Sequence, residues 1–326
     1  MSRPSSTSTD RAKRLALAVA TTVALVSASD RAAAQACCAG SGAVTPGRLA
    51  VHEDALVALQ LRAASVFGSF DSNGHYSTPP RGVSEQDFEQ DAIGAVRLPF
   101  ADRAQLAVLV PLVETRRTAG GVSEFGGGLG DINVSARYDF LYAGRERYIP
   151  GIAALVGLTV PSGKSADELD DDPSNALATK ATGIGAFQGN IGIALEQLWD
   201  GWLVTAYGIV AKRASRTVVG KNGAPDINSA LGTQWTALLS VAYSLPNDFA
   251  IAAFASYTGE GNADTNGVEQ SGTSRRVPIL GISGVAPVTE HFRFQGGFSG
   301  NPPIPSLGKN QPATIGFTVT ALYAWY

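Results

Sequence analysis

Residues 131–140 read DINVSARYDF, and apolar and polar side chains alternate at every position of this stretch. An alternation of period two places successive side chains on opposite faces of an extended strand, whereas a helix repeats its apolar positions every three or four residues. The stretch therefore predicts a β-strand with one apolar and one polar face. The apolar face carries Ile132, Val134, Ala136, Tyr138 and Phe140, and the polar face carries Asp131, Asn133, Ser135, Arg137 and Asp139.

The same alternation recurs toward the C-terminus. Residues 231–245 alternate large apolar side chains with small or polar ones, and residues 291–298 place three phenylalanines opposite His291, Arg293 and Gln295. Residues 228–247 contain no charged side chain, yet their polar residues still fall mostly at every second position. A transmembrane helix would not need that order, so these stretches also predict strands with one apolar face.

Twelve such segments follow one another, and the connections between them are alternately long and short. Hydrocarbon offers no hydrogen bonds, so a sheet that crosses a bilayer must close on itself. An even number of strands with long external loops and short periplasmic turns is typical of outer-membrane barrels. We therefore expect an all-β fold, an antiparallel transmembrane β-barrel of about 12 strands. The expected strands are 55–70, 87–98, 104–116, 129–141, 150–162, 183–198, 202–213, 230–245, 249–259, 276–287, 291–299 and 313–326.

The composition agrees with a membrane barrel. Of the 326 residues, 44% are hydrophobic and only 16% are charged, whereas soluble domains average about 25% charged residues. The net charge of −3 supplies no basic stripe, which argues against nucleic acid as a partner. The alternative is a soluble, secreted β-sandwich or barrel with the same alternation, whose apolar faces would have to meet in a core.

The first residues indicate export. Arg11, Lys13 and Arg14 precede an apolar stretch over 15–28, and Ala34-Gln35-Ala36 has the small-x-small pattern of a cleavage site. The apolar stretch is shorter than the roughly 18 to 20 residues that a spanning helix needs, which argues against an uncleaved anchor. We expect three parts: a signal peptide (1–36), a periplasmic N-terminal segment (37–54) and the barrel (55–326).

Cleavage after Ala36 would leave Cys37 at the new N-terminus, the position that is acylated in lipoproteins. The residues before it lack the aliphatic side chain with which a lipoprotein box normally begins. A disulfide between the adjacent residues Cys37 and Cys38 would be strained. We therefore expect an exposed, unmodified pair, with lipidation of Cys37 as the alternative.

Two stretches resemble a known family. Gly128-Leu129-Gly130-Asp131-Ile132-Asn133 leads to Arg137-Tyr138, and Pro150-Gly151 is followed by Gly157-Leu158-Thr159-Val160-Pro161-Ser162-Gly163-Lys164. Together they look like the hallmark stretch of outer-membrane barrels associated with the meta-pathway of phenol degradation. The Cys-Cys start after a signal peptide is also similar to some members. The resemblance implies an outer-membrane channel or transporter for small, often aromatic or hydrophobic compounds.

The sequence contains no enzyme motif with the required residue spacing, and no cofactor or metal is expected. Residues 157–165 resemble a phosphate-binding loop, but five residues separate Gly157 from Gly163 where that motif has four. His52-Glu53 lacks the second histidine of a zinc helix, because Leu56 stands there. A barrel phospholipase is a further alternative, yet the chain has only three histidines and no Gly-x-Ser-x-Gly elbow. We expect His75 in an external loop and His291 at a periplasmic turn, so the chain is not expected to be an enzyme.

Function then depends on the inward faces of the strands. Twelve strands are intermediate between barrels filled by side chains and barrels with a wide aqueous channel, so the interior could be a narrow pore or a plugged space. We expect passage of small solutes, with a structural or adhesive protein that uses its external loops as the alternative. Outer-membrane lipid, lipopolysaccharide and the barrel-insertion machinery are the other expected partners. The candidate pore-lining residues are Arg62, Glu89, Asp91, Arg97, Asp131, Arg137, Asp139, Glu196 and Arg293.

Overall fold

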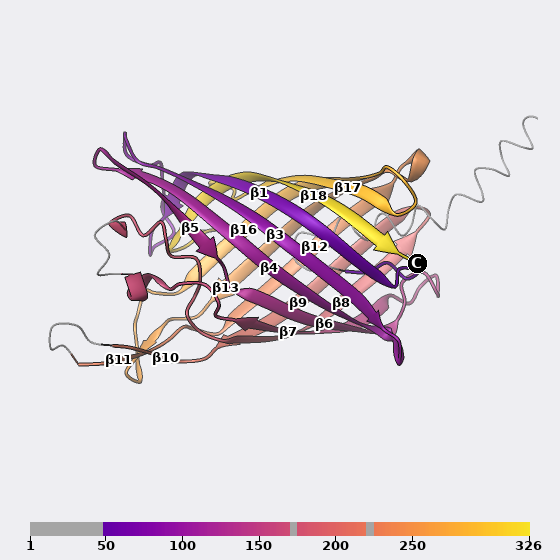
Figure 1. The fold of residues 1–326 in the computed structure, drawn as a ribbon, viewed down its shortest axis with the longest axis horizontal. Coiled ribbons are helices and arrows are strands. Elements are labelled where there is room, and N and C mark those ends of the chain that lie inside the picture. The colour runs from indigo at the N-terminus through magenta and orange to yellow at the C-terminus, as the bar shows by residue number, and fades with distance from the viewer. Residues whose placement is uncertain (1–47, 170–174, 220–224) are drawn as a thin grey trace, which may run out of the picture.

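The computed structural model describes residues 48–169, 175–219 and 225–326, and within them twelve antiparallel strands form a closed barrel (Figure 1). Each strand pairs with its neighbours in the ring. The expected fold class is confirmed. The ring consists of β1 (Ala55–Phe70), β3 (Ser84–Leu98), β4 (Ala101–Ala119), β6 (Ile132–Leu141), β7 (Gly151–Val160), β8 (Gln188–Trp199), β9 (Trp202–Arg213), β12 (Gln234–Ser244), β13 (Ala250–Glu260), β16 (Arg275–Pro287), β17 (Phe292–Gly300) and β18 (Gln311–Trp325).

The first and last strands close the ring. β1 and β18 pair antiparallel from Ala55 opposite Trp325 to Phe70 opposite Gln311, with one bulge between Val66 and Gly68. This pairing satisfies the backbone donors and acceptors that an open sheet edge would leave exposed to hydrocarbon. Among the described residues, no helix is long and apolar enough to cross a membrane.

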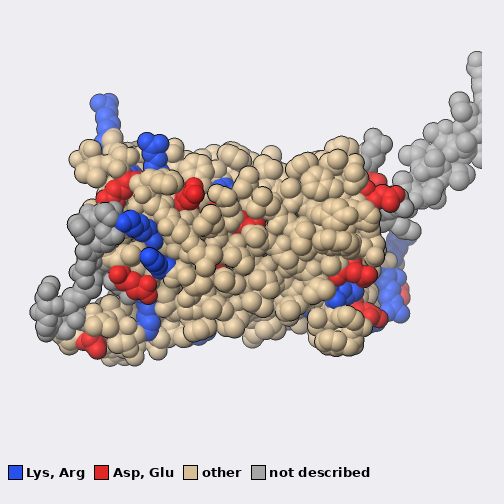
Figure 2. Space-filling view, in the orientation of Figure 1, with Lys and Arg blue, Asp and Glu red and all other residues tan. Residues whose placement is uncertain are grey.

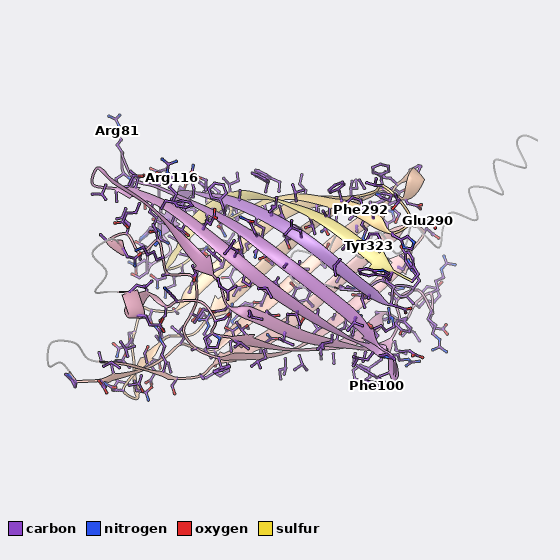
Figure 3. All side chains as sticks on the ribbon, in the orientation of Figure 1. Arg81, Phe100, Arg116, Glu290, Phe292 and Tyr323 are labelled. Carbon is purple, nitrogen blue, oxygen red and sulfur yellow. The ribbon has the colours of Figure 1, made fainter. Side chains whose placement is uncertain are left out.

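The two faces of the wall differ as the alternation predicts. On β6, Tyr138 and Phe140 are 42% and 52% exposed, whereas Asp139 between them is 5% exposed. Figure 2 shows a broad belt of uncharged side chains, with most of the charged ones at the two ends of the barrel. Phe100, Phe292 and Tyr323 lie at the end that holds the C-terminus (Figure 3). An apolar belt with aromatic residues at its margin is typical of a barrel wall that faces lipid.

The short turns lie at the end that holds the C-terminus, and the longer loops lie at the opposite, external end (Figure 1). Some of these loops carry ordered strands. β2 (Tyr76–Ser77) extends the edge of β1. A separate four-stranded sheet contains β10 (Arg216–Val218), β11 (Ile227–Ala230), β14 (Asp264–Thr265) and β15 (Val268–Glu269). One 3-10 turn (Ala166–Leu169) lies in the long loop between β7 and β8, and another (Pro246–Asp248) lies in the short turn between β12 and β13.

One expected loop is a hairpin instead. Residues 117–128 were expected to be a long external loop, but β4 continues to Ala119 and turns at Gly120-Gly121 into β5 (Val122–Leu129). Both glycines have positive φ angles, which side chains with a Cβ rarely adopt. β4 therefore pairs with β6 over its first part and with β5 over its second part. The loop prediction is wrong for this stretch.

Candidate functional site: the interior of the barrel

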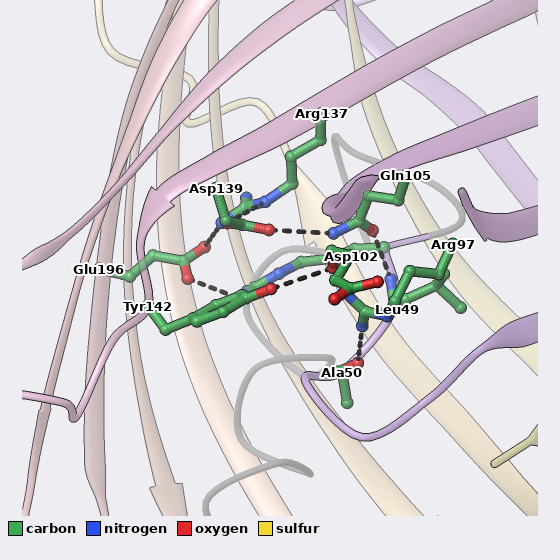
Figure 4. Close-up of polar contacts among 10 residues, drawn as sticks. Leu49, Ala50, Arg97, Asp102, Gln105, Arg137, Asp139, Tyr142 and Glu196 are labelled. Atoms are coloured by element: carbon green, nitrogen blue, oxygen red, sulfur yellow. Dashed lines mark hydrogen bonds and ion pairs between the residues drawn. The ribbon is translucent and has the colours of Figure 1, made fainter. Parts of the chain in front are cut away.

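Residues 48–54, which we call the plug, lie inside the periplasmic end of the barrel. Leu49 and Ala50 are 2% and 4% exposed, and Leu49 packs in one apolar cluster with Leu56, Ile93 and Leu322. The backbone N–H of Leu49 donates a hydrogen bond to Oε1 of Gln105 at 2.9 Å. The segment before the first strand thus fills part of the space that the barrel encloses (Figure 4).

Charged side chains hold the plug to three strands of the wall. Arg48 forms an ion pair with Glu196 on β8, and Arg137 on β6 lies 3.1 Å from the same carboxylate and 2.7 Å from Asp139. Gln105 on β4 donates to Asp139 at 3.3 Å (Figure 4). Two arginines therefore face two carboxylates. Loss of one partner from such a buried network typically costs about 3–5 kcal/mol, because it leaves an uncompensated charge.

Arg97 and Arg293 form the second anchor of the plug. Arg97 donates to the backbone oxygens of Ala50 and Glu53 at 2.6 and 3.0 Å, and Arg293 forms an ion pair with the fully buried carboxylate of Glu53. The other oxygen of that carboxylate accepts the N–H of Ala50 at 2.8 Å. These contacts fix a tight turn over 50–53 against the wall.

The nine predicted residues fall into three groups. Arg97, Arg137, Asp139, Glu196 and Arg293 hold the plug. Arg62 on β1 and Glu89 and Asp91 on β3 form a second cluster, in which Nε of Arg62 donates to Oδ2 of Asp91 at 3.1 Å and the guanidinium pairs with Glu89. Asp131 stands apart at the external end of the wall. Its carboxylate accepts the backbone N–H groups of Gly163 and Ile184 at 3.0 and 2.7 Å.

Arg48, Glu53 and Gln105 are not among the residues that the sequence predicts for the interior. The first two precede the first strand, where no alternation indicates a face, and Gln105 carries no charge that would indicate an ion pair. Cys37, Cys38 and the expected signal peptide (1–36) lie outside the described residues.

Part of the interior is apolar. Leu155, Tyr207 and Leu238 are each less than 7% exposed and pack together with Ile209 and Phe254, all from the wall between β7 and β13. A cavity of about 200 Å³ lies between this wall and the plug network. It is lined on the polar side by Arg48, Gln105 and Arg137 and on the apolar side by Leu109, Leu155 and Ile209. The space thus combines charged and apolar surfaces.

A loop segment covers the inner side of β5 at the external end. Glu124 accepts the N–H groups of Ala176 and Leu177, and Arg117 donates to the backbone oxygens of Leu177 and Ala178. Gly126 leaves room for Thr179, because a Cβ at Gly126 would lie 2.7 Å from its hydroxyl oxygen. Thr179 is fully buried as a result. Residues 175–184, which we call the mouth segment, therefore pack closely against β5, where Gly126 has no side chain in the way.

The histidines lie at the two ends of the barrel. His75 contacts the carboxylate of Asp71 in the loop between β1 and β3, with Nδ1 3.2 Å from Oδ2. Hydrogen bonds from the backbone N–H groups of His75 and Asn73 hold the pKa of Asp71 below its usual value. His291 stacks on Tyr323 beside the last strand. In the part of the chain that the structure describes, no three His, Cys, Asp or Glu side chains form a group that could hold a metal ion.

Comparison with solved structures supports the barrel. The chain is similar to an outer membrane channel from Pseudomonas putida F1, with a TM-score of 0.70 and 15% identity, over 86% of this chain and 100% of that one. It is less similar to the translocator domain of the autotransporter NalP from Neisseria meningitidis (TM-score 0.46, 10% identity, 96% and 98% coverage). For a mutant of the TodX monoaromatic hydrocarbon channel the TM-score is 0.40, with 12% identity and 83% and 90% coverage.

A search of curated proteins finds no match to the chain. The family model described as "Putative MetA-pathway of phenol degradation" matches residues 70–303, which is well over half of the chain. This match includes both stretches that carry the resemblance in the sequence, and the fold is that of an outer-membrane barrel. The chain belongs to the family described as "Putative MetA-pathway of phenol degradation".

Proposed function

We propose that the barrel is a channel that carries small, partly apolar solutes across the outer membrane of a Gram-negative-type bacterium, and that it is not an enzyme. The observation that carries this proposal is the interior cavity between the plug network and the apolar wall. Its volume of about 200 Å³ suits a molecule with a single aromatic ring better than a sugar chain. A binding space with mostly apolar walls and a few charged groups favours ligands of mixed character.

The plug restricts the path through the barrel in this proposal. It occupies the periplasmic end, and charged side chains of β3, β6, β8 and β17 hold it there together with Gln105 of β4. Arg97, Arg137, Asp139, Glu196 and Arg293 would then control exit from the interior, while Arg62, Glu89, Asp91 and Asp131 would line the path nearer to the external end. The family's description names phenol degradation, so simple aromatic compounds are the first solutes to test.

Release of the plug tests the proposal. Arg48→Ala removes the ion pair with Glu196, and we expect a severalfold rise in single-channel conductance and in the rate at which aromatic solutes enter proteoliposomes. Arg145→Ala is the matched control, because Arg145 is exposed in a turn outside the barrel interior. If neither the wild-type protein nor the Arg48 variant admits ions or solutes while both migrate as folded barrels on a gel, the chain is not a channel.

The external sheet favours a second candidate, an adhesive role. The sheet of β10, β11, β14 and β15 extends beyond the barrel, and its Val268 is 63% exposed (Figure 1). An adhesin would lose surface binding when residues 264–269 are replaced by a short Gly-Ser turn, and it would be insensitive to substitutions inside the barrel. A channel predicts the opposite pattern.

The outer surface suggests how the barrel meets the membrane. The apolar belt would contact lipid, and Arg81 and Arg116 extend from the external end, where lipopolysaccharide phosphates would lie (Figure 3). Arginine is well suited to phosphate recognition because its guanidinium donates two parallel hydrogen bonds. The aromatic residues of β18 would serve recognition by the insertion machinery.

A further inference from the structure

The inward face of β3 carries four successive acidic side chains in its external half. Glu85, Asp87, Glu89 and Asp91 follow one another with the period of two that places them all on one face. Successive members lie about 6.6–6.8 Å apart along a strand. We call these four residues the acidic ladder.

In the part of the chain that the structure describes, the ladder has twice as many carboxylates as arginines around it. Glu85 pairs with Arg117 at 2.8 Å, but Glu89 and Asp91 share the single guanidinium of Arg62. Among the described residues, Asp87 accepts a hydrogen bond only from the neutral hydroxyl of Thr115, at 3.0 Å. Among the described residues, the four carboxylates of the ladder therefore face two arginines, Arg62 and Arg117.

The other ion pairs of the interior match in number. In the plug network two arginines face two carboxylates, and Arg293 pairs with Glu53. Arg213 on β9 pairs with Glu260 on β13 at 2.8 Å. Arg97 and Asp131 bind backbone groups at the two ends of the barrel, away from the ladder. The ladder is thus the cluster in which carboxylates outnumber arginines.

The buried oxygen Oδ1 of Asp91 has no donor among the described residues. Asp91 is fully buried, and its Oδ2 accepts from Arg62, while its Oδ1 accepts no hydrogen bond from any described residue. A buried carboxylate oxygen without a donor is costly, and the cost falls when a cationic group approaches. Burial and charge at this position therefore point to a positively charged ligand.

The apolar wall lies across the barrel from the ladder. In the closed ring β3 is the second strand and β12 is the eighth, so six steps separate them in either direction. Leu238 of β12 packs with Tyr207 of β9 and Leu155 of β7 in the apolar cluster. A solute between the two walls would meet carboxylates on one side and hydrocarbon with a tyrosine ring on the other.

We propose that the barrel selects small organic cations, in which an ammonium group is joined to an apolar or aromatic body. The ammonium group is drawn along the ladder, and the apolar body follows the opposite wall. This inference rests on the proposed channel function. Walls of one sign of charge raise the local concentration of counter-ions, and the enrichment falls as salt screens the field.

The test compares two probes that share one aromatic ring. Phenyltrimethylammonium and benzenesulfonate are permanently charged and cross bilayers poorly, so their entry into proteoliposomes reports the protein. At low ionic strength we expect the wild-type protein to admit the cation about tenfold faster than the anion. The variant Asp87→Asn/Glu89→Gln/Asp91→Asn should bring the ratio close to one. Tetramethylammonium, which lacks the ring, should enter more slowly than phenyltrimethylammonium.

The control removes the same number of carboxylates outside the interior. Glu146→Gln, Asp200→Asn and Glu290→Gln change exposed residues of the periplasmic turns, and this triple variant should keep the wild-type ratio. Heat-modifiable migration on a gel shows whether each variant is folded. If the ladder triple variant fails to fold, Asp87→Asn alone serves, because Asp87 forms no ion pair with any residue that the structure describes, and it should lower the ratio in part.

The outcomes separate the two proposals. Equal entry of both probes through a conducting wild-type protein overturns the cation selectivity and leaves the channel intact. An unchanged ratio in the ladder variant overturns it as well. If the wild-type protein conducts no ions and admits neither probe, the channel function fails and the selectivity fails with it.

Discussion

Asp131 shows what a single inward carboxylate does at the external end of the wall. It lies in the break between β5 and β6, and its two oxygens accept N–H groups from Gly163 and Ile184. Each such charge-assisted hydrogen bond contributes about 1.5–3 kcal/mol. We expect Asp131→Ala to release the mouth segment, so that trypsin cleaves after Lys164 and Lys180 several times faster in proteoliposomes. Mass spectrometry of the fragments measures this.

The matched control for that prediction is Asp102→Ala, because Asp102 is exposed and offers only its backbone oxygen to Arg97 and Tyr142. Asp131→Asn keeps one acceptor oxygen and should be intermediate. Cleavage rates that are equal in the Asp131→Ala and Asp102→Ala variants would show that Asp131 does not hold the segment.

For a single residue, the sequence predicts the strand face on which its side chain lies better than it predicts the residue that this side chain contacts. The period of two places Arg137 and Asp139 on the same side of β6, and both take part in the plug network. Arg48, which pairs with Glu196 in the same network, could not be predicted, because it comes from a segment without periodicity that enters the barrel only in the folded chain. A local pattern determines orientation, whereas a contact across the interior depends on the path of the whole chain.

Among the elements, β5 differs most from expectation. Its glycines at 126, 127 and 128 weaken a strand pattern and favour a loop, because glycine has no side chain to pack and a high conformational freedom. Pairing with β4 nevertheless satisfies its backbone. The mouth segment needs the space at Gly126 and could not be predicted, because the glycines alone indicate only a flexible stretch.

The same element yields a prediction. Gly126→Val places a side chain where Thr179 now lies, since even a Cβ would come within 2.8 Å of its backbone. We expect the variant to displace the mouth segment, with faster tryptic cleavage after Lys180, while the barrel still shows heat-modifiable migration. Gly189→Val is the control, because a Cβ there meets nothing within 4 Å. Resistance to trypsin equal to that of the control would contradict this packing.

For the whole molecule, closure and lipid exposure follow from the alternation together with the even number of strands. Twelve strands were expected and twelve form the ring, because each apolar face must meet hydrocarbon and each backbone group must be paired. The sequence does not decide whether the interior is a narrow pore or a plugged space. Strand patterns do not report on a segment such as 48–54, whose burial requires the finished ring around it.

The membrane orientation of the wall can be tested through one position on β16. Ile282 is 63% exposed in the middle of the strand and lies beside Phe298, which is 50% exposed. If this face contacts the bilayer centre, Ile282→Arg should lower the free energy of unfolding by about 2–4 kcal/mol, because an arginine there must be taken from water into hydrocarbon. Val288→Arg changes a residue that is 59% exposed at the turn after β16, where the cost should be about 0–1 kcal/mol. Urea unfolding of the protein in phospholipid vesicles measures both variants, and equal losses would place Ile282 outside the membrane.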